Sequence, residues 1–168
     1  MEKISKNCSY EEATRSNTAK RLGISNDPNP EQLACMKNLA TRIFEPIREH
    51  FGVPIYISSF FRSDVLNKAV KGASNSQHVK GEAMDIDAHI FGSITNKQIF
   101  EYIKDNLEYD QLIAEELEDD STEPSWVHIS FTGKRPNRKE TLVHKTELKK
   151  STYYKYDQEK GLDIRSYR

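Results

Sequence analysis

The chain has 168 residues, of which 36% are hydrophobic and 30% are charged, and its formal net charge is −1. This length suits one domain that can bury a core without disulfide staples, and the composition is not that of a disordered chain. Because nucleic-acid binding requires a basic footprint, the near-neutral charge gives no reason to expect a nucleic-acid partner. The two cysteines, Cys8 and Cys35, lack C-x-x-C spacing and are expected to be idle thiols.

No apolar run approaches the roughly 20 residues that a membrane-spanning helix needs, so we expect no membrane span. The first seven residues lack the apolar core of a secretory signal. We therefore expect a protein made in the cytoplasm, without a signal peptide, that works outside the cell only after release by other means. We also expect it to be a monomer.

Two helical segments are expected in the first third of the chain. Ser9 and Glu12 form a capping box that opens a short helix reaching about Arg21. A longer helix begins after Asn29, a natural N-cap. Its apolar residues recur at three- and four-residue steps: Leu33, Met36, Ala40, Ile43, Ile47 and Phe51. Pro46 is expected to kink or interrupt this helix.

Four strands are expected in the middle of the chain, at residues 55–58, 83–87, 110–114 and 126–131. The second of them alternates like a half-buried strand, with Met84 and Ile86 on one face and Asp85 and Asp87 on the other. A short helix near residues 64–70 and a helix capped by Thr95 separate these strands. The pattern indicates a protein that combines helices and strands.

The chain divides by composition into residues 1–132, which carry this pattern, and residues 133–168. The second part is rich in Lys, Arg, Glu and Tyr and has few apolar residues. We expect it to be a charged C-terminal extension, with one short strand at residues 141–143 and poor order beyond it.

His78, Asp85 and His128 are candidate metal ligands. Zinc accepts imidazole nitrogen and carboxylate oxygen, and catalytic zinc sites use three protein ligands with a fourth position for water. Gly81 lets the chain turn between His78 and the strand of Asp85, and His128 shares the polar face of its strand with Trp126. The spacing alone is a weak pattern, because a single histidine is more often an ordinary surface or hydrogen-bonded residue.

The motifs around these residues occur in one order: Ser58-Ser59-Phe60-Phe61-Arg62-Ser63, Asn75-Ser76-Gln77-His78, Gly81-Glu82-Ala83-Met84-Asp85-Ile86, Asp110-Gln111-Leu112-Ile113 and Trp126-Val127-His128-Ile129-Ser130. In these motifs the chain resembles the family of zinc D-alanyl-D-alanine carboxypeptidases and L-alanyl-D-glutamate endopeptidases. It is most similar to the small phage and bacterial cell-wall peptidases of that family. The resemblance covers about residues 9–132.

The resemblance implies an α+β fold, with a small antiparallel sheet and helices packed against it. It implies one zinc ion per chain, held by His78, Asp85 and His128. The implied activity is hydrolysis of a peptide bond in peptidoglycan stem peptides, by a D,D-carboxypeptidase or an endopeptidase. Residues 1–132 are then the zinc peptidase domain. Such a protein acts on the cell wall once it is released, for example by phage lysis, as an endolysin does.

The resemblance also implies residues around the metal. Arg62 is expected to be catalytic and to bind substrate, because a fixed guanidinium can hold a peptide carboxylate or a developing oxyanion. Ser76 and Gln77 are expected to hydrogen-bond substrate or to hold the neighbouring metal-binding histidine, and Trp126 is expected to contact substrate. Asp87 shares a strand face with the ligating aspartate and is expected to orient a ligating histidine.

The general base has two candidates. Many relatives carry a carboxylate three residues before the last histidine, where this chain has Ser125. Glu115 is the preferred base, because it ends a predicted strand and matches a run that this branch of the family carries. Glu123 is the alternative base, although Pro124 bends the chain between it and His128.

A function without catalysis stays open at this point: a cell-wall-binding module or a phage structural module on the same fold. The serine at position 125 and the charged C-terminal extension favour that alternative. His50 and His144 belong to no motif.

Overall fold

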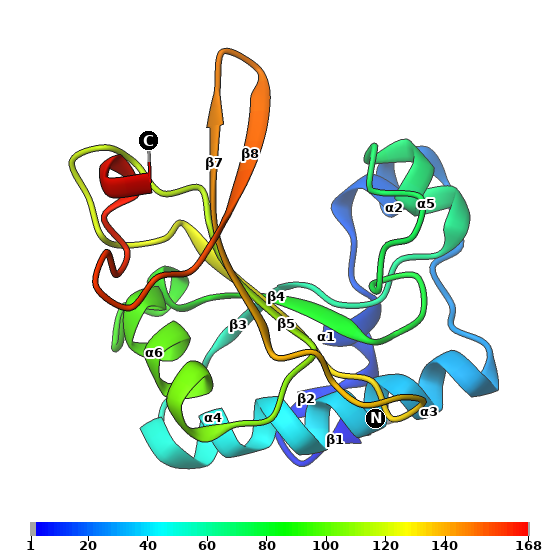
Figure 1. Cartoon of the computed structure of the whole chain (residues 1–168). Coiled ribbons are helices and arrows are strands. Elements are labelled where there is room, and N and C mark those ends of the chain that lie inside the picture. The colour runs from blue at the N-terminus through cyan, green and yellow to red at the C-terminus, as the bar shows by residue number, and fades with distance from the viewer. Residues whose placement is uncertain (1–2, 168) are drawn as a thin grey trace.

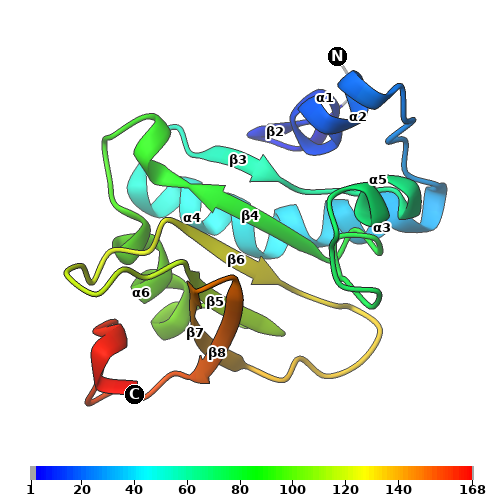
Figure 2. The same cartoon turned by 90° about the horizontal axis from the view of Figure 1, so that it is seen from above.

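A six-stranded sheet runs through the centre of the protein (Figure 1). The computed structural model describes residues 3–167. Residues 1 and 2 of the predicted domain 1–132, and residue 168 of the predicted extension 133–168, lie outside the described residues. The strands of this sheet are β3 (Tyr56–Ser59), β4 (Ala83–Asp87), β5 (Gln111–Glu115), β6 (Trp126–Ser130), β7 (Glu140–Glu147) and β8 (Lys150–Lys155). Their order across the sheet is β3-β4-β6-β5-β7-β8, which Figure 2 shows from above. The strands β1 (Lys3–Ser5) and β2 (Cys8–Ser9) form a separate two-stranded sheet.

The α+β class predicted from the sequence is confirmed, but the central sheet is mixed and not, as we expected, antiparallel throughout. Four of its five strand pairs are antiparallel, and β5 and β7 are parallel. The parallel pair arises because β6 and β7 run on opposite sides of β5. The chain reverses direction once into β6 and again into β7, so that β7 runs in the same direction as β5.

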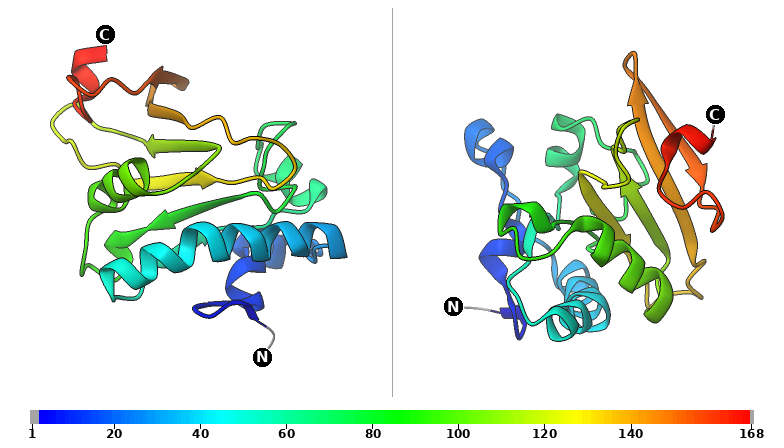
Figure 3. Two further views of the ribbon diagram at one scale, coloured as in Figure 1. Left: turned by 60° about the horizontal axis from the view of Figure 1, so that its bottom comes forward. Right: turned by 90° about the vertical axis from the view of Figure 1, so that its left-hand side faces the viewer.

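The helices are α1 (Tyr10–Thr14), α2 (Asn17–Leu22), α3 (Pro30–Leu39), the π-helix η1 (Ala40–Phe44), α4 (Glu45–Phe51), α5 (Asp64–Ala69), the 3-10 helix η2 (Ala88–Ile90), α6 (Asn96–Asn106) and the 3-10 helix η3 (Ile164–Tyr167). Figure 1 shows α3, α4 and α6 below the strands, and Figure 3 shows the same arrangement from two other sides. Within residues 3–167, no helix has the length and apolar character needed to cross a membrane.

One face of the sheet is apolar and packs against α3, α4 and α6. Its buried side chains come from three neighbouring strands: Met84, Ile86, Leu112, Ala114, Val127 and Ile129. Burying a side chain of this kind stabilises the fold by about 1.5–3 kcal/mol. Because side chains alternate along a strand, the intervening residues Asp85, Ile113 and His128 project from the opposite face.

The helix expected from Ser9 to about Arg21 is two helices. The capping box at Ser9 is present, and α1 ends at Thr14. Ser16 then adopts an extended backbone, with φ −154° and ψ 119°, and its side chain accepts a hydrogen bond from the N–H of Ala19. Ser16 is thus a second N-cap, and an extended residue at this position separates α1 from α2.

The long amphipathic helix expected after Asn29 is present and is interrupted in the middle. The π-helical turn η1 joins α3 to α4, and Pro46 lies in the first turn of α4. Proline has no backbone N–H and its ring crowds the preceding turn, so a widened turn relieves both conflicts. The predicted apolar stripe is buried, since Met36, Ile43 and Ile47 are each 0% exposed.

The segment after residue 132 differs from the charged, poorly ordered extension that the composition indicates. It contributes β7 and β8 to the central sheet, where the predicted strand at residues 141–143 is part of β7. Leu162 and Ile164 are buried in the same core as the helices. The apolar residues of this segment are few and widely spaced, so they form no periodic signal, but Val143, Leu162 and Ile164 are buried.

Candidate metal centre and pocket

His78, Asp85 and His128 come together on the polar face of the sheet. Asp85 lies on β4 and His128 on β6, where the two are direct partners in the antiparallel register. Oδ1 of Asp85 lies 2.8 Å from Nδ1 of His128 and 3.3 Å from Nε2 of His78. The ligand atoms of the three residues lie within 4.8 Å of one another, so this cluster could hold a metal ion.

The position of His78 depends on the turn before β4. Gly81 has a φ of +71°, and a Cβ at this position would lie 2.5 Å from the carbonyl oxygen of Gln32, so the turn requires glycine. Nδ1 of His78 lies 2.6 Å from the carbonyl oxygen of Phe60, and Nε2 is then the nitrogen that faces Asp85. Such a second hydrogen bond commonly fixes the ring of a metal-binding histidine.

The electrostatics of the cluster favour the forms of these residues that bind metals. Burial lowers the pKa of His78, although the nearby Asp85 carboxylate opposes the shift. Burial alone would raise the pKa of Asp85, but His78 and His128 hold this pKa well below its usual value. A neutral imidazole and an ionised carboxylate are the forms that coordinate a metal ion.

The donor set and its geometry fit zinc. Ligand atoms at tetrahedral positions around zinc lie roughly 3.3 Å apart. The 3.3 Å between His78 Nε2 and Asp85 Oδ1 matches this spacing, and the 2.8 Å between His128 Nδ1 and Asp85 Oδ1 is shorter. Nε2 of His78 is buried and has no hydrogen-bond partner of regular geometry among residues 3–167. A buried nitrogen without a partner is costly, and a metal ion at this point would satisfy it.

The cluster opens into a pocket of about 1060 Å³. Eight of the residues predicted for the site line it: Arg62, Ser76, Gln77, His78, Asp85, Glu115, Trp126 and His128. Arg62 follows β3 and is partly buried, and burial lowers the pKa of its guanidinium while Asp85 opposes that shift. Because an arginine side chain is not deprotonated in proteins, Arg62 places a cation beside the cluster.

Ser76 and Gln77 are both tied to protein groups. Oγ of Ser76 accepts a hydrogen bond of 3.3 Å from the backbone N–H of His78. Nε2 of Gln77 donates a hydrogen bond of 3.1 Å to Oδ2 of Asp110. Ser76 therefore supports the loop that carries His78, and Gln77 joins the pocket to a buried carboxylate.

Glu115 ends β5 and faces the pocket. It stands opposite Trp126 in the register of β5 and β6, and its residue is 7% exposed. Its Oε2 lies 2.5 Å from Nδ1 of His144 on β7. Two residues earlier on β5, Ile113 stands opposite His128, so strand geometry places the Cα atoms of Glu115 and His128 roughly 8 Å apart.

Glu123 and Asp87 lie outside this pocket in the described part of the chain. Both contact His89: Oε1 of Glu123 lies 3.0 Å from its Nε2, and Oδ1 of Asp87 accepts a hydrogen bond from its backbone N–H. The structure therefore does not bring Glu123 to the metal cluster. The group that orients His78 is the backbone carbonyl of Phe60, and not Asp87 as predicted. Every residue has a backbone carbonyl, so no pattern of residue types could indicate this contact.

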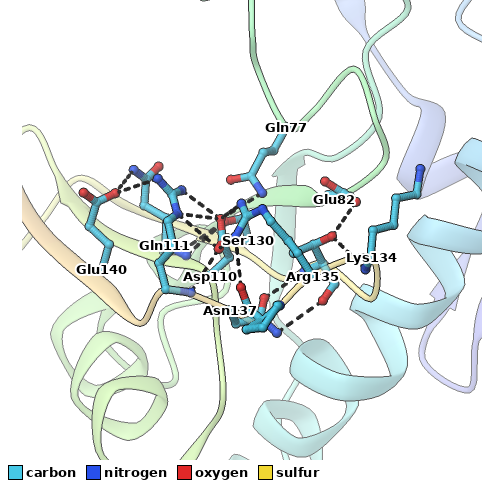
Figure 4. A network of polar contacts seen from close by, with 12 residues as sticks. Gln77, Glu82, Asp110, Gln111, Ser130, Lys134, Arg135, Asn137 and Glu140 are labelled. Carbon is cyan, nitrogen blue, oxygen red and sulfur yellow. Dashed lines mark hydrogen bonds and ion pairs between the residues drawn. The ribbon is translucent and has the colours of Figure 1, made fainter.

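Two arginines that the sequence motifs do not single out also line the pocket. Arg135 and Arg138 bind the fully buried Asp110, with contacts of 2.6 Å and 2.8 Å, in the network of Figure 4. Burial alone would raise the pKa of Asp110, but the hydrogen bonds from both arginines hold it well below its usual value. Arg135 lies 25 residues after Asp110, and no local pattern connects residues so far apart.

The comparison with family models gives one match, to a model described as Peptidase M15, over residues 6–115. This range contains Arg62, His78 and Asp85 and ends at Glu115, and His128 follows it on β6. The comparison with curated proteins gives no match. Because the match covers more than half of the chain, it confirms the family resemblance, and the chain belongs to the peptidase M15 family.

Proposed function

We propose that this protein is a zinc-dependent peptidase that hydrolyses a peptide bond in peptidoglycan stem peptides, as a D,D-carboxypeptidase or an endopeptidase. The observation that carries the proposal is the cluster of His78, Asp85 and His128 in one pocket of a peptidase M15 chain. These three residues would hold one zinc ion per chain and leave a position for water or substrate. Glu115 and Arg62 share the pocket and supply the remaining groups that hydrolysis needs.

The proposed chemistry is the addition of water to an amide. Zinc, when bound, lowers the pKa of a water ligand to about 7 and polarises a carbonyl group. Glu115 takes a proton from the attacking water as the water oxygen bonds to the carbonyl carbon. The carbon–nitrogen bond then breaks, and Glu115 passes the proton to the leaving amine. Arg62 donates hydrogen bonds to the developing oxyanion or to a substrate carboxylate.

The pocket suits a short peptide that carries carboxylates. Trp126 offers an apolar surface at the rim of the sheet, and Gln77 offers an amide. Arg62, Arg135 and Arg138 place three guanidinium groups around the same space. Stem peptides end in carboxylates and carry them along their length, so the guanidinium of Arg62 complements them, while Arg135 and Arg138 already pair with Asp110. A substrate of this kind places the site of action at the cell wall, after release of the protein, for example by phage lysis.

The direct test is turnover of purified peptidoglycan by the zinc-loaded protein, with the released fragments identified by mass spectrometry. Cleavage within the stem peptide, loss of cleavage with a chelator and recovery on addition of zinc are the expected results. The fragment masses also separate a carboxypeptidase, which releases a single D-alanine, from an endopeptidase. A zinc-loaded protein that leaves all stem peptides intact would contradict the proposal.

A wall-binding or phage structural module without turnover is the second candidate. The observation that favours it is Ser125, which stands where many relatives carry a carboxylate. Oγ of Ser125 donates a hydrogen bond of 3.1 Å to the backbone carbonyl of Glu116, so it is engaged outside the metal cluster. Sedimentation of the zinc-loaded protein with intact walls, without fragments in the supernatant, would support this second function.

A further inference from the structure

His144 is a buried titratable residue for which the proposed chemistry has no role so far. It lies on β7, beyond the residues that the family model matches, and it is 4% exposed. Its Nδ1 lies 2.5 Å from Oε2 of Glu115 and 3.8 Å from Oε1 of Glu116. Neither ring nitrogen has a hydrogen-bond partner of regular geometry among residues 3–167. The ring is therefore buried against the carboxylate of the proposed base, in contact with it but outside regular hydrogen-bond geometry.

Tyr153 holds the same ring from the other side. Tyr153 on β8 is the register partner of His144, and the two rings stack with centroids 4.2 Å apart and an interplanar angle of 18°. Burial and the nearby carboxylates of Glu115 and Glu116 raise the pKa of Tyr153 to about 12, so its hydroxyl stays neutral at pH 7. The imidazole is thus fixed between a neutral aromatic ring and a carboxylate.

The physical consequence concerns the Glu115 carboxylate. A carboxylate that is 7% exposed has little access to water, so a neighbouring polar group must replace part of its hydration. An imidazole can supply that group, because a ring nitrogen that carries a proton donates N–H. A general base must also stay in one place, and a fixed neighbour limits the positions that its side chain can take.

We propose that His144 is a positioning residue for Glu115, and that its imidazole, stacked on Tyr153, keeps the Glu115 carboxylate in place at the pocket. This inference rests on the proposed function, in which Glu115 is the general base. It also gives the β7–β8 hairpin a part in catalysis. The hairpin carries the residue that holds the base, and it also contributes Leu142 and Tyr153 to the pocket wall.

The test uses the full-length, zinc-loaded protein and a purified stem-peptide substrate. His144→Phe keeps a ring to stack on Tyr153 and removes the polar contact. We expect kcat to fall by about 10- to 100-fold, the usual loss when the partner of a functional side chain is removed. KM should stay within about twofold, and zinc content should be unchanged. His144→Gln, whose amide can donate a hydrogen bond, should recover a large part of kcat.

A double variant separates positioning from general structural damage. If His144 acts through Glu115, then His144→Phe should cause no further loss of kcat in a Glu115→Gln background. The matched control is His50→Phe, since His50 also stacks on a tyrosine, Tyr102, with centroids 4.0 Å apart, and lies outside the pocket. It should keep wild-type kcat. His144→Met replaces His144→Phe, with the same expectation, if the phenylalanine variant does not fold.

The outcomes distinguish this inference from the function on which it rests. Unchanged kcat in His144→Phe, together with a large loss in Glu115→Gln, would overturn the role of His144 and keep Glu115 as the base. Additive losses in the double variant would equally overturn it. Unchanged kcat in Glu115→Gln would instead remove Glu115 as the base, and His144 with it. A zinc-loaded wild type that cleaves no stem peptide would refute the proposed function itself.

Discussion

Oδ1 of Asp85 lies 2.8 Å from Nδ1 of His128, across the two neighbouring antiparallel strands β4 and β6. The register sets this contact, because it places the two residues directly opposite each other on one face. A slip of one residue would turn the side chain of His128 toward the apolar face and separate the pair. Two of the three candidate ligands are therefore held by the pairing of central strands, and His78 joins them from the loop before β4.

The first prediction is that the wild-type protein binds one zinc ion per chain and that His128→Ala abolishes this binding. Removal of one of three ligands leaves a pair that cannot complete a catalytic zinc site. Elemental analysis of protein purified without a metal-affinity tag measures the zinc content. His89→Ala is the control, because His89 contacts Glu123 outside the pocket. Full zinc occupancy in His128→Ala would show that the ion lies elsewhere.

The second prediction concerns the general base. Glu115→Gln keeps the shape of the side chain but cannot accept a proton, so it should retain zinc and lose at least about 100-fold in kcat. Steady-state assays on stem peptides give this value. Glu123→Gln should keep nearly all activity, because Glu123 is engaged with His89 outside the pocket. Inactivation by Glu123→Gln and not by Glu115→Gln would reverse the assignment.

The third prediction concerns the C-terminal segment. Ile164 is 0% exposed and belongs to the main core, so Ile164→Ala should lower the free energy of unfolding by about 2–5 kcal/mol. Leu148, at the tip of the β7–β8 hairpin, is fully exposed, and Leu148→Ala should change this free energy by no more than about 0.5 kcal/mol. Denaturant titration measures both. Deletion of residues 151–168 removes Ile164 and all of β8 except Lys150, and it should destabilise the protein strongly. Equal stability of the deletion and the full chain would contradict the placement of this segment.

The fourth prediction is a pH dependence that originates at Asp110. The arginines hold the folded-state pKa of Asp110 well below its usual value. Its contribution to stability should therefore be fully present above the unfolded-state pKa of about 3.9. It should be lost as the pH falls toward the lower folded-state pKa. Asp110→Asn should lower stability near neutral pH and flatten this dependence, which thermal unfolding between acid and neutral pH records.

The control for this prediction is Asp163→Asn. Asp163 also pairs with an arginine, Arg165, but this ion pair is solvent-exposed. Exposed ion pairs contribute little, so this variant should unfold like the wild type across the same pH range. An equal effect of the two substitutions would mean that the buried network of Figure 4 is not the source of the pH dependence.

The local elements of the fold could be predicted from the sequence, because their signals are short in range. The capping boxes at Ser9 and Asn29 and the strand that carries Asp85 follow from residue type and period. The resemblance of the motifs to those of the peptidase family also predicts that His78, Asp85 and His128 meet. Each of these three residues lies next to residues whose types predict a turn or a strand.

Several other contacts between distant segments were decided by the tertiary structure alone. The Phe60 group that orients His78 is a backbone carbonyl, which every residue has, so the residue type does not indicate the contact. Glu115 and His144 are in contact and lie on β5 and β7, which pair in parallel. The alternation of residues along a strand does not indicate which other strand it pairs with. Ile164 lies far from the rest of the core along the chain, in a segment whose composition is polar. The sequence alone determines which residues have side chains that can bind a metal and which segments can form helices and strands. Which of them touch depends on how the whole chain buries its apolar surface, and that is a property of the complete fold.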